Sequence, residues 1–513
     1  MFLIWFGLVL LLLTAFKSRR KQMKIFESLG IPGPKPNILF GNAIEIAKHG
    51  SNQMFPKWTR KFGPIVGFFL GGRPQVLISD VDLIRQVLIT DFHVFTDRQI
   101  VVPGGIHPQN QMKNTVPWSK GNDWKRIRSQ FIPLLSSSKV RKLEDVIMPF
   151  ILNMRSKIDQ ELKFDGEMNI APILQDASFL IGVKSLTGIN VSTNLLSYEM
   201  KSLYKAIQSN LQRSVLAMAM VLFPSLTFIA YPLRVWWESL RLKMKWSTEG
   251  VCLNATKEII RLRKETKIES NDLLQSMLSL ENDAGMEMLS SDDMTYQRWT
   301  KSRTFNFSED DIAANAFLLL FAAFETTSST LQFTISNLVR NQDVQNELRS
   351  ELQNQIRLND GLENLAAISK VPLLQYVIKE TLRMFPPASP GTSRVAQEDY
   401  ELKGHHVPKG TGIFISVMSV HYDPQLWPEP YKFQPRRFEG EYNQLAFLPF
   451  GAGPRVCIGI HFALVELQLI LAHLILRYRF EPTAQTSERI EITESNITIY
   501  PKNGVNCKVV KIE

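Results

Sequence analysis

The residues with the clearest chemical potential lie in one glycine-rich stretch near the C-terminus, FLPFGAGPRVCIGIHFA, which runs from Phe447 to Ala463. Its cysteine, Cys457, can serve as a nucleophile, a redox group or a metal ligand once it is a thiolate. Glycines on both sides allow the backbone to pass close to a flat cofactor, and Arg455 supplies a cation for an anionic group. We therefore expect a thiolate site beside a cofactor, with Cys457 just before a helix N-terminus that favours the thiolate.

Other chemistry for this stretch is less well supported by its residues. The run Gly451-x-Gly453-x-x-Val456 lacks the third glycine and the strand–helix setting of a dinucleotide site. Cys457 and His461 are spaced so that both could face one zinc ion, but no other Cys/His pair completes the ligand set. An inert, packed cysteine is the ordinary alternative.

The stretch resembles the haem-binding loop of the cytochrome P450 superfamily, Phe-x-x-Gly-x-Arg-x-Cys-x-Gly. The matching residues are Phe450, Gly453, Arg455, Cys457 and Gly459. The resemblance implies haem b (iron protoporphyrin IX) with the Cys457 thiolate as the axial ligand of the iron. It also places Arg455 at a haem propionate and Phe450 in the haem-binding loop, and it implies the mainly α cytochrome P450 fold.

A second segment, Ala322-Ala323-Phe324-Glu325-Thr326-Thr327, resembles the oxygen-activation motif of the same family. The resemblance makes Glu325 and Thr326 the catalytic pair. Thr326 can hold a water beside bound oxygen or bond the carbonyl one turn back, while Glu325 supplies protons for O–O cleavage. Ala323 stands where the family usually has glycine. The alternative is a threonine that bonds its own helix, with Glu325 in a structural ion pair.

Further residues match the family's haem-binding and structural positions. Trp124 and Arg128 lie four apart and share a helix face, and the resemblance implies that both hold haem propionates. Arg394 and Arg98 match two further propionate-binding positions.

A structural motif of the family is also present. Glu380 and Arg383 share a helix face at three-residue spacing, and with Arg437 they match a buried structural triad. Arg436 departs from the acid that is usual before that arginine. Asp123 to Ser129 and Phe321 to Thr327 look closest to microsomal family 3 and its relative thromboxane synthase.

The elements that position these residues are mostly helical. We expect strands at Ile65 to Leu70 and Gln75 to Ser79, joined by the turn Gly71-Gly72. Ser308 and the acids after it predict a capped helix that runs to about Asn341 and crosses the domain interior. Another helix begins near Pro372 and ends before Pro386-Pro387, and a last one follows Gly459. The fold class is therefore mainly α with a smaller β part.

The N-terminus predicts a membrane anchor. Residues 1–16 are uncharged and almost wholly apolar, and a basic cluster follows without a signal-cleavage pattern. We divide the chain into a transmembrane signal-anchor (1–16), a basic and proline-rich linker (17–36) and one haem-thiolate catalytic domain (37–513). The basic side of the anchor predicts a single-pass protein of the endoplasmic reticulum membrane whose catalytic domain faces the cytoplasm. A cleaved signal is the alternative.

A second apolar stretch, Val215 to Leu233, is long enough to span a membrane by hydropathy. Pro224 and Pro232 argue against a straight helix. We expect a loop that dips into the membrane surface, with Trp236 and Trp237 near the interface. Ordinary core packing is the alternative.

Composition narrows the function classes further. The 513 residues carry 59 Lys and Arg against 49 Asp and Glu, and no nucleic-acid motif accompanies this basic balance. Anionic membrane lipid and acidic protein partners are therefore preferred to nucleic acid. Besides Cys457, only Cys252 and Cys507 occur, which is no disulfide framework and favours a reducing compartment.

The resemblance implies a monooxygenase that inserts one oxygen atom of O2 into a lipophilic small molecule. Electrons would come from an NADPH-cytochrome reductase, with cytochrome b5 as an optional second donor, and Lys120, Lys125 and Arg126 could form part of the docking face. Phe317, Phe321, Phe324, Ala388 and the Ile100-Val101 region are candidate pocket liners or plain core. A haem-thiolate peroxide isomerase like thromboxane synthase, which needs no reductase, and a non-catalytic haem carrier or sensor are the alternatives.

Overall fold

The computed structural model describes residues 2–99, 111–136, 140, 143–162, 166–189, 220, 223, 227–243, 248–266, 272–282, 307–388, 392–494 and 498–512. The α-helices are α1 (Phe2–Gln22), α2 (Ile25–Ser28), α3 (Ala43–His49), α4 (Ser51–Phe62), α5 (Val81–Arg85), α6 (Gly121–Phe131), α8 (Glu144–Glu161), α9 (Ala171–Thr187), α12 (Thr227–Lys243), α13 (Thr248–Thr266), α14 (Leu273–Asn282), α16 (Glu309–Arg340), α17 (Gln342–Arg357), α18 (Leu365–Ile368), α19 (Pro372–Met384), α20 (Val417–His421) and α21 (Ile460–Arg477). The strands are β1 (Ile65–Leu70), β2 (Arg73–Ile78), β3 (Glu167–Asn169), β4 (Ser393–Val395), β5 (Tyr400–Leu402), β6 (His405–Val407), β7 (Gly412–Ile415), β8 (Tyr478–Glu481), β9 (Ile492–Glu494), β10 (Ile499–Pro501) and β11 (Asn506–Lys511). Short turns of other helix types are η1 (Gln86–Thr90), η2 (Gln111–Asn114), η3 (Ile132–Leu135), η6 (Pro435–Phe438), η7 (Gln444–Ala446) and η8 (Gly453–Arg455).

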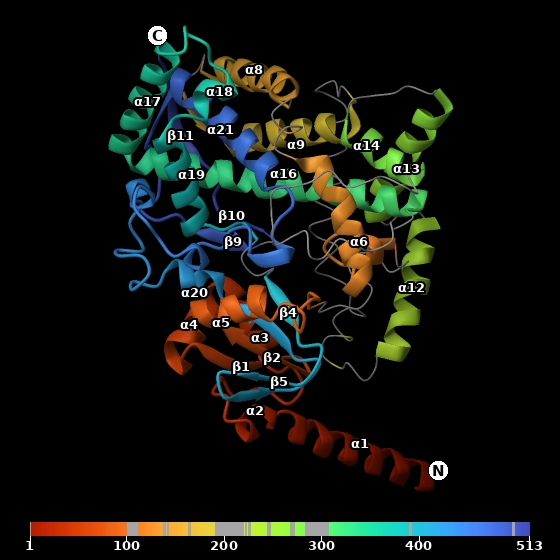
Figure 1. Cartoon of the computed structure of the whole chain (residues 1–513). Coiled ribbons are helices and arrows are strands. Elements are labelled where there is room, and N and C mark those ends of the chain that lie inside the picture. The colour runs from red at the N-terminus through yellow and green to blue at the C-terminus, as the bar shows by residue number, and fades with distance from the viewer. Residues whose placement is uncertain are drawn as a thin grey trace.

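Helix α16 is the central element and crosses the middle of the molecule (Figure 1). It begins with a capping box, in which the Ser308 Oγ accepts from the Asp311 N–H at 3.2 Å and Asp311 accepts from the Ser308 N–H at 3.1 Å. Asn341 caps its other end. The predicted capped helix is therefore confirmed, because caps and first-turn acids are local signals that need no tertiary context.

The largest hydrophobic core lies between α16 and the helices around it. Buried side chains of α8, α9, α17, α19 and α21 meet those of α16, among them Leu331, Leu374 and Ile470. The expected helices are confirmed as α19 and α21, whose N-termini lie at Pro372 and after Gly459. Because α21 follows the cysteine stretch directly, this core also fixes the position of Cys457.

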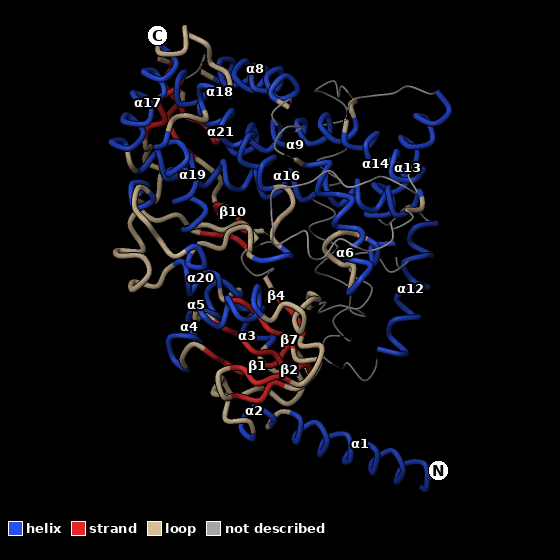
Figure 2. The backbone as a smooth tube through the Cα atoms, in the orientation of Figure 1, coloured by secondary structure: helices blue, strands red, loops and turns tan. Residues whose placement is uncertain are grey.

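Strands form a smaller part of the fold and gather mainly in the lower half of the molecule (Figure 2). The four-stranded sheet has the order β1-β2-β7-β4, with only the β2–β7 pair parallel. Both expected strands are confirmed, although the second begins at Arg73 and ends at Ile78. Three further small sheets pair β3-β11-β8, β9-β10 and β5-β6. One large, mainly α domain with a smaller β part results.

Helix α1 projects from the sheet end of the domain (Figure 1). Its helical conformation continues past residue 16 to Gln22, because the basic residues that follow the apolar run are good helix formers. Exposed apolar side chains on it include Trp5, Phe6 and Leu10. Within the segment expected to be a linker, Phe26 is buried and packs on Phe69 of β1 with ring centroids 5.1 Å apart.

Among the described residues, two helices, α16 and α21, are long and apolar enough to span a membrane. Both are mostly buried inside the domain, 67% and 61% respectively over the most apolar window, so they are core helices. The apolar stretch from Val215 to Leu233 lies partly outside the described residues. Where it is described, residues 227–233 belong to α12 and Pro232 lies inside that helix, so the expected loop is wrong for these residues. The helix tolerates it at the cost of one backbone hydrogen bond.

Candidate active site

The cysteine stretch forms a tight loop that leads into α21. The Cys457 N–H donates to the Phe450 carbonyl at 3.0 Å, which closes the loop. Gly451 and Gly453 have φ values of +72° and +70°, a conformation that favours glycine. A Cβ at Gly453 would lie 2.0 Å from the carbonyl oxygen of Leu88. The glycine therefore allows the loop to pack against η1, which is a close approach within the protein.

The Cys457 side chain faces a space inside the molecule. Its surface is accessible to a water-sized sphere, yet burial among protein atoms raises the pKa of its thiol. Both observations hold when the accessible surface of the side chain faces inward. The Gly459 N–H, Arg128 and Arg98 oppose the effect of burial and lower the pKa. A thiolate at this position is thus stabilised by one N–H and two cations.

The middle of α16 also has accessible surface where a core helix should be covered. Ala322 is exposed and Thr326 is partly exposed, although the residues on either side of this part of the helix are mostly buried. Ile458, next to Cys457, and Phe321 pack against the same hydrophobic cluster. Both elements therefore belong to one region, and a group that binds beside Cys457 would cover the exposed face of α16.

The two predicted catalytic residues differ in their surroundings. The Thr326 hydroxyl donates to the Ala322 carbonyl at 2.8 Å, so it bonds the carbonyl one turn back. Glu325 is 1% exposed, and its backbone carbonyl accepts from the Tyr500 hydroxyl at 3.0 Å. The Thr326 oxygen keeps its lone pairs as acceptors, because the bond to Ala322 uses only its proton.

Four arginine side chains surround the same region and influence one another. Burial, together with Arg98 and Arg128, lowers the pKa of Arg394 to about 9. Burial, followed by Arg98 and Arg394, lowers the pKa of Arg455 to about 8. Arg128 donates to the Val456 carbonyl at 2.7 Å, and Arg98 donates to the Arg455 carbonyl at 3.3 Å. Both of these acceptors belong to residues within two positions of Cys457, so the cluster lies against the cysteine loop.

Within the described residues, one carboxylate faces this cluster. Asp97 lies 3.7 Å from the Arg455 guanidinium and raises its pKa, but it cannot balance four cations. Several buried donors also have no hydrogen-bond partner among the described residues, namely the Nε atoms of Arg98 and Arg394 and the indole Nε1 of Trp124. Buried cations and donors of this kind are costly unless an anion pairs with them.

These residues fit a haem. Its two propionates would bring the missing negative charge to the arginine cluster and accept from the orphaned donors of Arg394 and Trp124. Cys457 offers the one soft ligand that haem iron takes from such a loop. Among the described residues, no group of three His, Cys, Asp or Glu side chains could hold a metal ion, so the zinc alternative with His461 has no support there.

Arg455 has more protein partners than the sequence indicated. Its guanidinium donates to the carbonyls of Thr96, Val116 and Ser119 at 3.0, 3.5 and 3.0 Å. Its central carbon lies 4.0 Å from the centre of the Trp124 ring. The residue thus fastens the cysteine loop to the segments before α6 in addition to carrying charge. Asp97 and these carbonyls carried no local sequence signal, since they are more than 300 residues away.

The predicted structural triad is confirmed. The Glu380 carboxylate accepts from Arg383 Nε at 2.7 Å and from Arg437 Nε at 3.0 Å, and all three side chains are at most 9% exposed. Arg436, which replaces the usual acid, points to the surface and pairs with Glu347 at 2.5 Å. The departure therefore leaves the triad intact.

The candidate pocket liners divide into two groups. Phe317 and Phe324 are buried, and Phe324 packs edge-on against Phe179 at 5.4 Å, so both belong to the core. Phe321 and Ala388 keep partial exposure. The Ile100-Val101 region lies outside the described residues.

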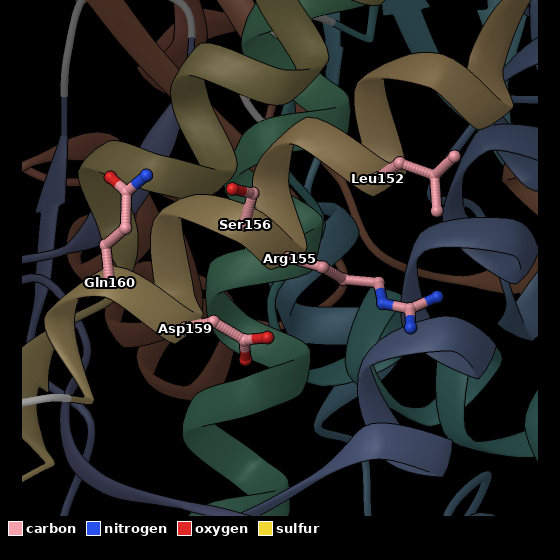
Figure 3. A pocket seen from close by; sticks show the side chains of 5 residues that line it. All are labelled: Leu152, Arg155, Ser156, Asp159 and Gln160. Carbon is pink, nitrogen blue, oxygen red and sulfur yellow. The ribbon is translucent and has the colours of Figure 1, made fainter.

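A separate hollow lies on α8, away from these groups. It has a volume of about 370 Å³ and is lined by Leu152, Arg155, Ser156, Asp159 and Gln160 (Figure 3). The carboxylate of Asp159 already accepts from the Tyr478 hydroxyl and Lys511 Nζ, both at 2.7 Å. The hollow is therefore a polar surface feature. Asp159 in its lining joins α8 to the C-terminal sheet of β8 and β11.

Comparison with known proteins agrees with this site. The family model described as Cytochrome P450 matches residues 31–507. Cytochrome P450 3A14 of Cavia porcellus is 30% identical over 519 residues, which covers 99% of this chain and 96% of the relative. Cytochrome P450 3A11 of Mus musculus is 29% identical, with the same shares of both chains covered. Thromboxane-A synthase of Sus scrofa is 28% identical and covers 94% and 92% of the two chains.

Proposed function

The chain belongs to the cytochrome P450 family of haem monooxygenases, and we propose that it takes its electrons from an NADPH-cytochrome reductase to oxygenate a lipophilic substrate. Members of this family bind haem through a cysteine thiolate. The single observation that carries the proposal is the cluster of four arginines, three of them buried, beside Cys457, because the one carboxylate that faces it among the described residues cannot balance this charge.

We assign the haem-binding roles residue by residue. Cys457 would ligate the haem iron, and the propionates would be held by Arg98, Trp124, Arg128, Arg394 and Arg455. Phe450 supports the loop, since its carbonyl accepts the Cys457 N–H at 3.0 Å. When bound, the haem supplies the oxygen chemistry, in which one atom of O2 enters the substrate and the thiolate donates electron density to the iron.

Two residues of α16 handle protons in this proposal. The Thr326 oxygen lies on the accessible face of the helix and can accept a hydrogen bond there, since its own proton goes to Ala322. Glu325, one position earlier, supplies protons from its buried carboxyl group. Helix α16 runs without a break through Ala323, which stands in place of the usual glycine.

Electron delivery requires a surface that a reductase can recognise. Lys120 is exposed and Lys125 and Arg126 are partly exposed, at the start of the helix that carries Trp124 and Arg128. Asp123 lies 3.8 Å from Arg126 and weakens this patch only in part. We therefore propose that these three cations attract an acidic face of the reductase, and that cytochrome b5 can use the same face.

Exposed apolar side chains on two helices support a proposal of membrane attachment. Helix α1 carries Trp5 and Phe6, which are 66% and 60% exposed, and a basic end at Arg19 to Lys21. We propose that residues 1–16 cross the endoplasmic reticulum membrane once and leave the catalytic domain in the cytoplasm. Helix α12 exposes Phe228 and Trp236, which supports a second contact with the lipid surface.

Reconstitution tests this function. The full chain with NADPH-cytochrome reductase in phospholipid vesicles should consume NADPH and O2 and place labelled oxygen from O2 in a lipophilic substrate. A library of steroids, fatty acids and drug-like compounds serves as the substrate set. Absence of NADPH consumption with every compound, in a preparation that retains haem, would contradict reductase dependence.

The similarity to thromboxane-A synthase favours one second candidate, a haem-thiolate peroxide isomerase. Such an enzyme needs neither reductase nor proton delivery. Turnover of a lipid peroxide without NADPH, unchanged by substitution of Thr326, would select this alternative.

A further inference from the structure

A buried histidine outside the family motifs connects the structural triad to the cysteine loop. His421 lies at the end of α20 and is 0% exposed. Its Nδ1 lies 2.8 Å from the Arg383 carbonyl oxygen, and its Nε2 lies 2.8 Å from the Leu448 backbone nitrogen. Leu448 stands two residues before Phe450, where the loop around Cys457 closes.

The two contacts fix the form of the ring. A carbonyl oxygen can only accept a hydrogen bond, so Nδ1 must carry the proton. A backbone N–H can only donate, so Nε2 must be unprotonated. One neutral tautomer satisfies both bonds. Burial, which lowers the pKa of His421 to about 3, agrees with a neutral ring.

The surroundings hold the ring rigidly. The Arg383 guanidinium donates to the His421 carbonyl at 2.7 Å, so the two residues exchange a pair of hydrogen bonds. The Phe447 ring stacks on the imidazole at 5.9 Å with an angle of 17°. The Trp427 indole donates to the Ala446 carbonyl at 3.1 Å, which fixes the same segment of chain two residues before Leu448.

The start of the Cys457 loop depends on the position of the Leu448 peptide, which His421 holds. The Leu448 carbonyl accepts from the Gly451 N–H at 3.1 Å, which makes the first turn, and the Phe450 carbonyl accepts from Cys457. The position of the sulfur is therefore set through Leu448 by a ring that is itself bonded to Arg383 of the triad.

We propose that His421 is a positioning residue that holds Leu448, and through it the Cys457 loop, in the geometry that keeps the thiolate on the iron. This inference rests on the proposed haem-thiolate function. Loss of the Nε2 acceptor leaves the buried Leu448 N–H without a partner, and the loop can then relax away from the iron.

Three variants separate the two hydrogen bonds. His421→Gln places an amide oxygen near the position of Nε2 and keeps an acceptor for Leu448. His421→Asn is too short to reach Leu448 but keeps a donor for Arg383, and His421→Ala removes both. The control is His473→Ala, since His473 is buried to the same degree on α21 and pairs with Glu363 away from the loop.

The measurement is the rate at which the ferrous carbon-monoxide complex of the full-length holoenzyme loses its thiolate-type absorption band during mild warming. We expect His421→Asn and His421→Ala to convert about tenfold faster than wild type, and His421→Gln to stay close to wild type. The reduction potential of the haem should shift in the same order. If His421→Ala binds no haem, the comparison of the Gln and Asn variants still tests whether His421 positions the loop.

Two results would overturn the inference while leaving the proposed function standing. One is a wild-type thiolate band with equal conversion rates in all His421 variants. The other is an equal acceleration by His473→Ala, which would mean that general destabilisation explains the effect. A wild-type protein without the thiolate band would instead remove the proposed function itself.

Discussion

Removal of Glu380 should destabilise the domain far more than removal of any surface acid. The carboxylate accepts four hydrogen bonds, from Arg383 Nε and Nη2 at 2.7 and 2.9 Å, from Arg437 Nε at 3.0 Å and from the Gln434 N–H at 3.0 Å. Glu380→Ala leaves two guanidinium groups, 0% and 9% exposed, without their carboxylate. Breaking a buried pair by removing one partner costs about 3–5 kcal/mol.

That loss is a large part of the about 5–15 kcal/mol by which a domain is usually stable. The assay is the midpoint of guanidinium unfolding, followed by haem absorption and by circular dichroism. The matched control is Glu347→Ala, which removes an acid from the neighbouring Arg436 at the surface and should cost at most about 1 kcal/mol. Equal midpoints for the two variants would refute the reasoning that the triad stabilises the fold.

Three further predictions follow from the site. Arg394→Leu removes one of several cations that repel one another, so the haem-free variant should be at least as stable as the haem-free wild type. Its affinity for haem, measured by titration, should fall about tenfold or more. Thr326→Ala should lower product formed per NADPH consumed by about 10²-fold, with haem content unchanged. Burial raises the pKa of Glu466 to about 8, so the folded protein keeps a proton that the unfolded chain releases near pH 4.3. The free energy of unfolding should therefore decline as the pH rises from about 4.3 to 8. In urea unfolding measured over this range, Glu466→Gln should flatten the decline.

The sequence alone was sufficient to predict the parts of the fold that local signals decide, such as the starts of helices. The capping box at Ser308, the proline at Pro372 and the glycine at Gly459 each mark a helix start that the structure places at the same residue or the next. These helix-start signals depend on backbone groups within a few residues, so tertiary packing does not override them. The triad was accessible only through the resemblance to the family, because a Glu and an Arg three residues apart on one helix do not by themselves indicate Arg437.

Other parts of the site depend on contacts between distant segments. No pattern near Arg455 indicates that its guanidinium bonds the carbonyl of Thr96, 359 residues away. The reason for glycine at Gly453 is likewise the carbonyl of Leu88, which belongs to η1. The bridging role of His421 needs both Arg383 and Leu448 in place, and neither is its neighbour in the sequence.

The central claim is that Cys457 holds haem iron as a thiolate. Its most direct test is the ferrous carbon-monoxide absorption spectrum of the purified wild type and of Cys457→Ala. We predict a thiolate-type band in the wild type and its loss in the variant, with any remaining haem bound through another ligand. A wild-type protein that carries no porphyrin, or a variant with the same spectrum as the wild type, would contradict the account.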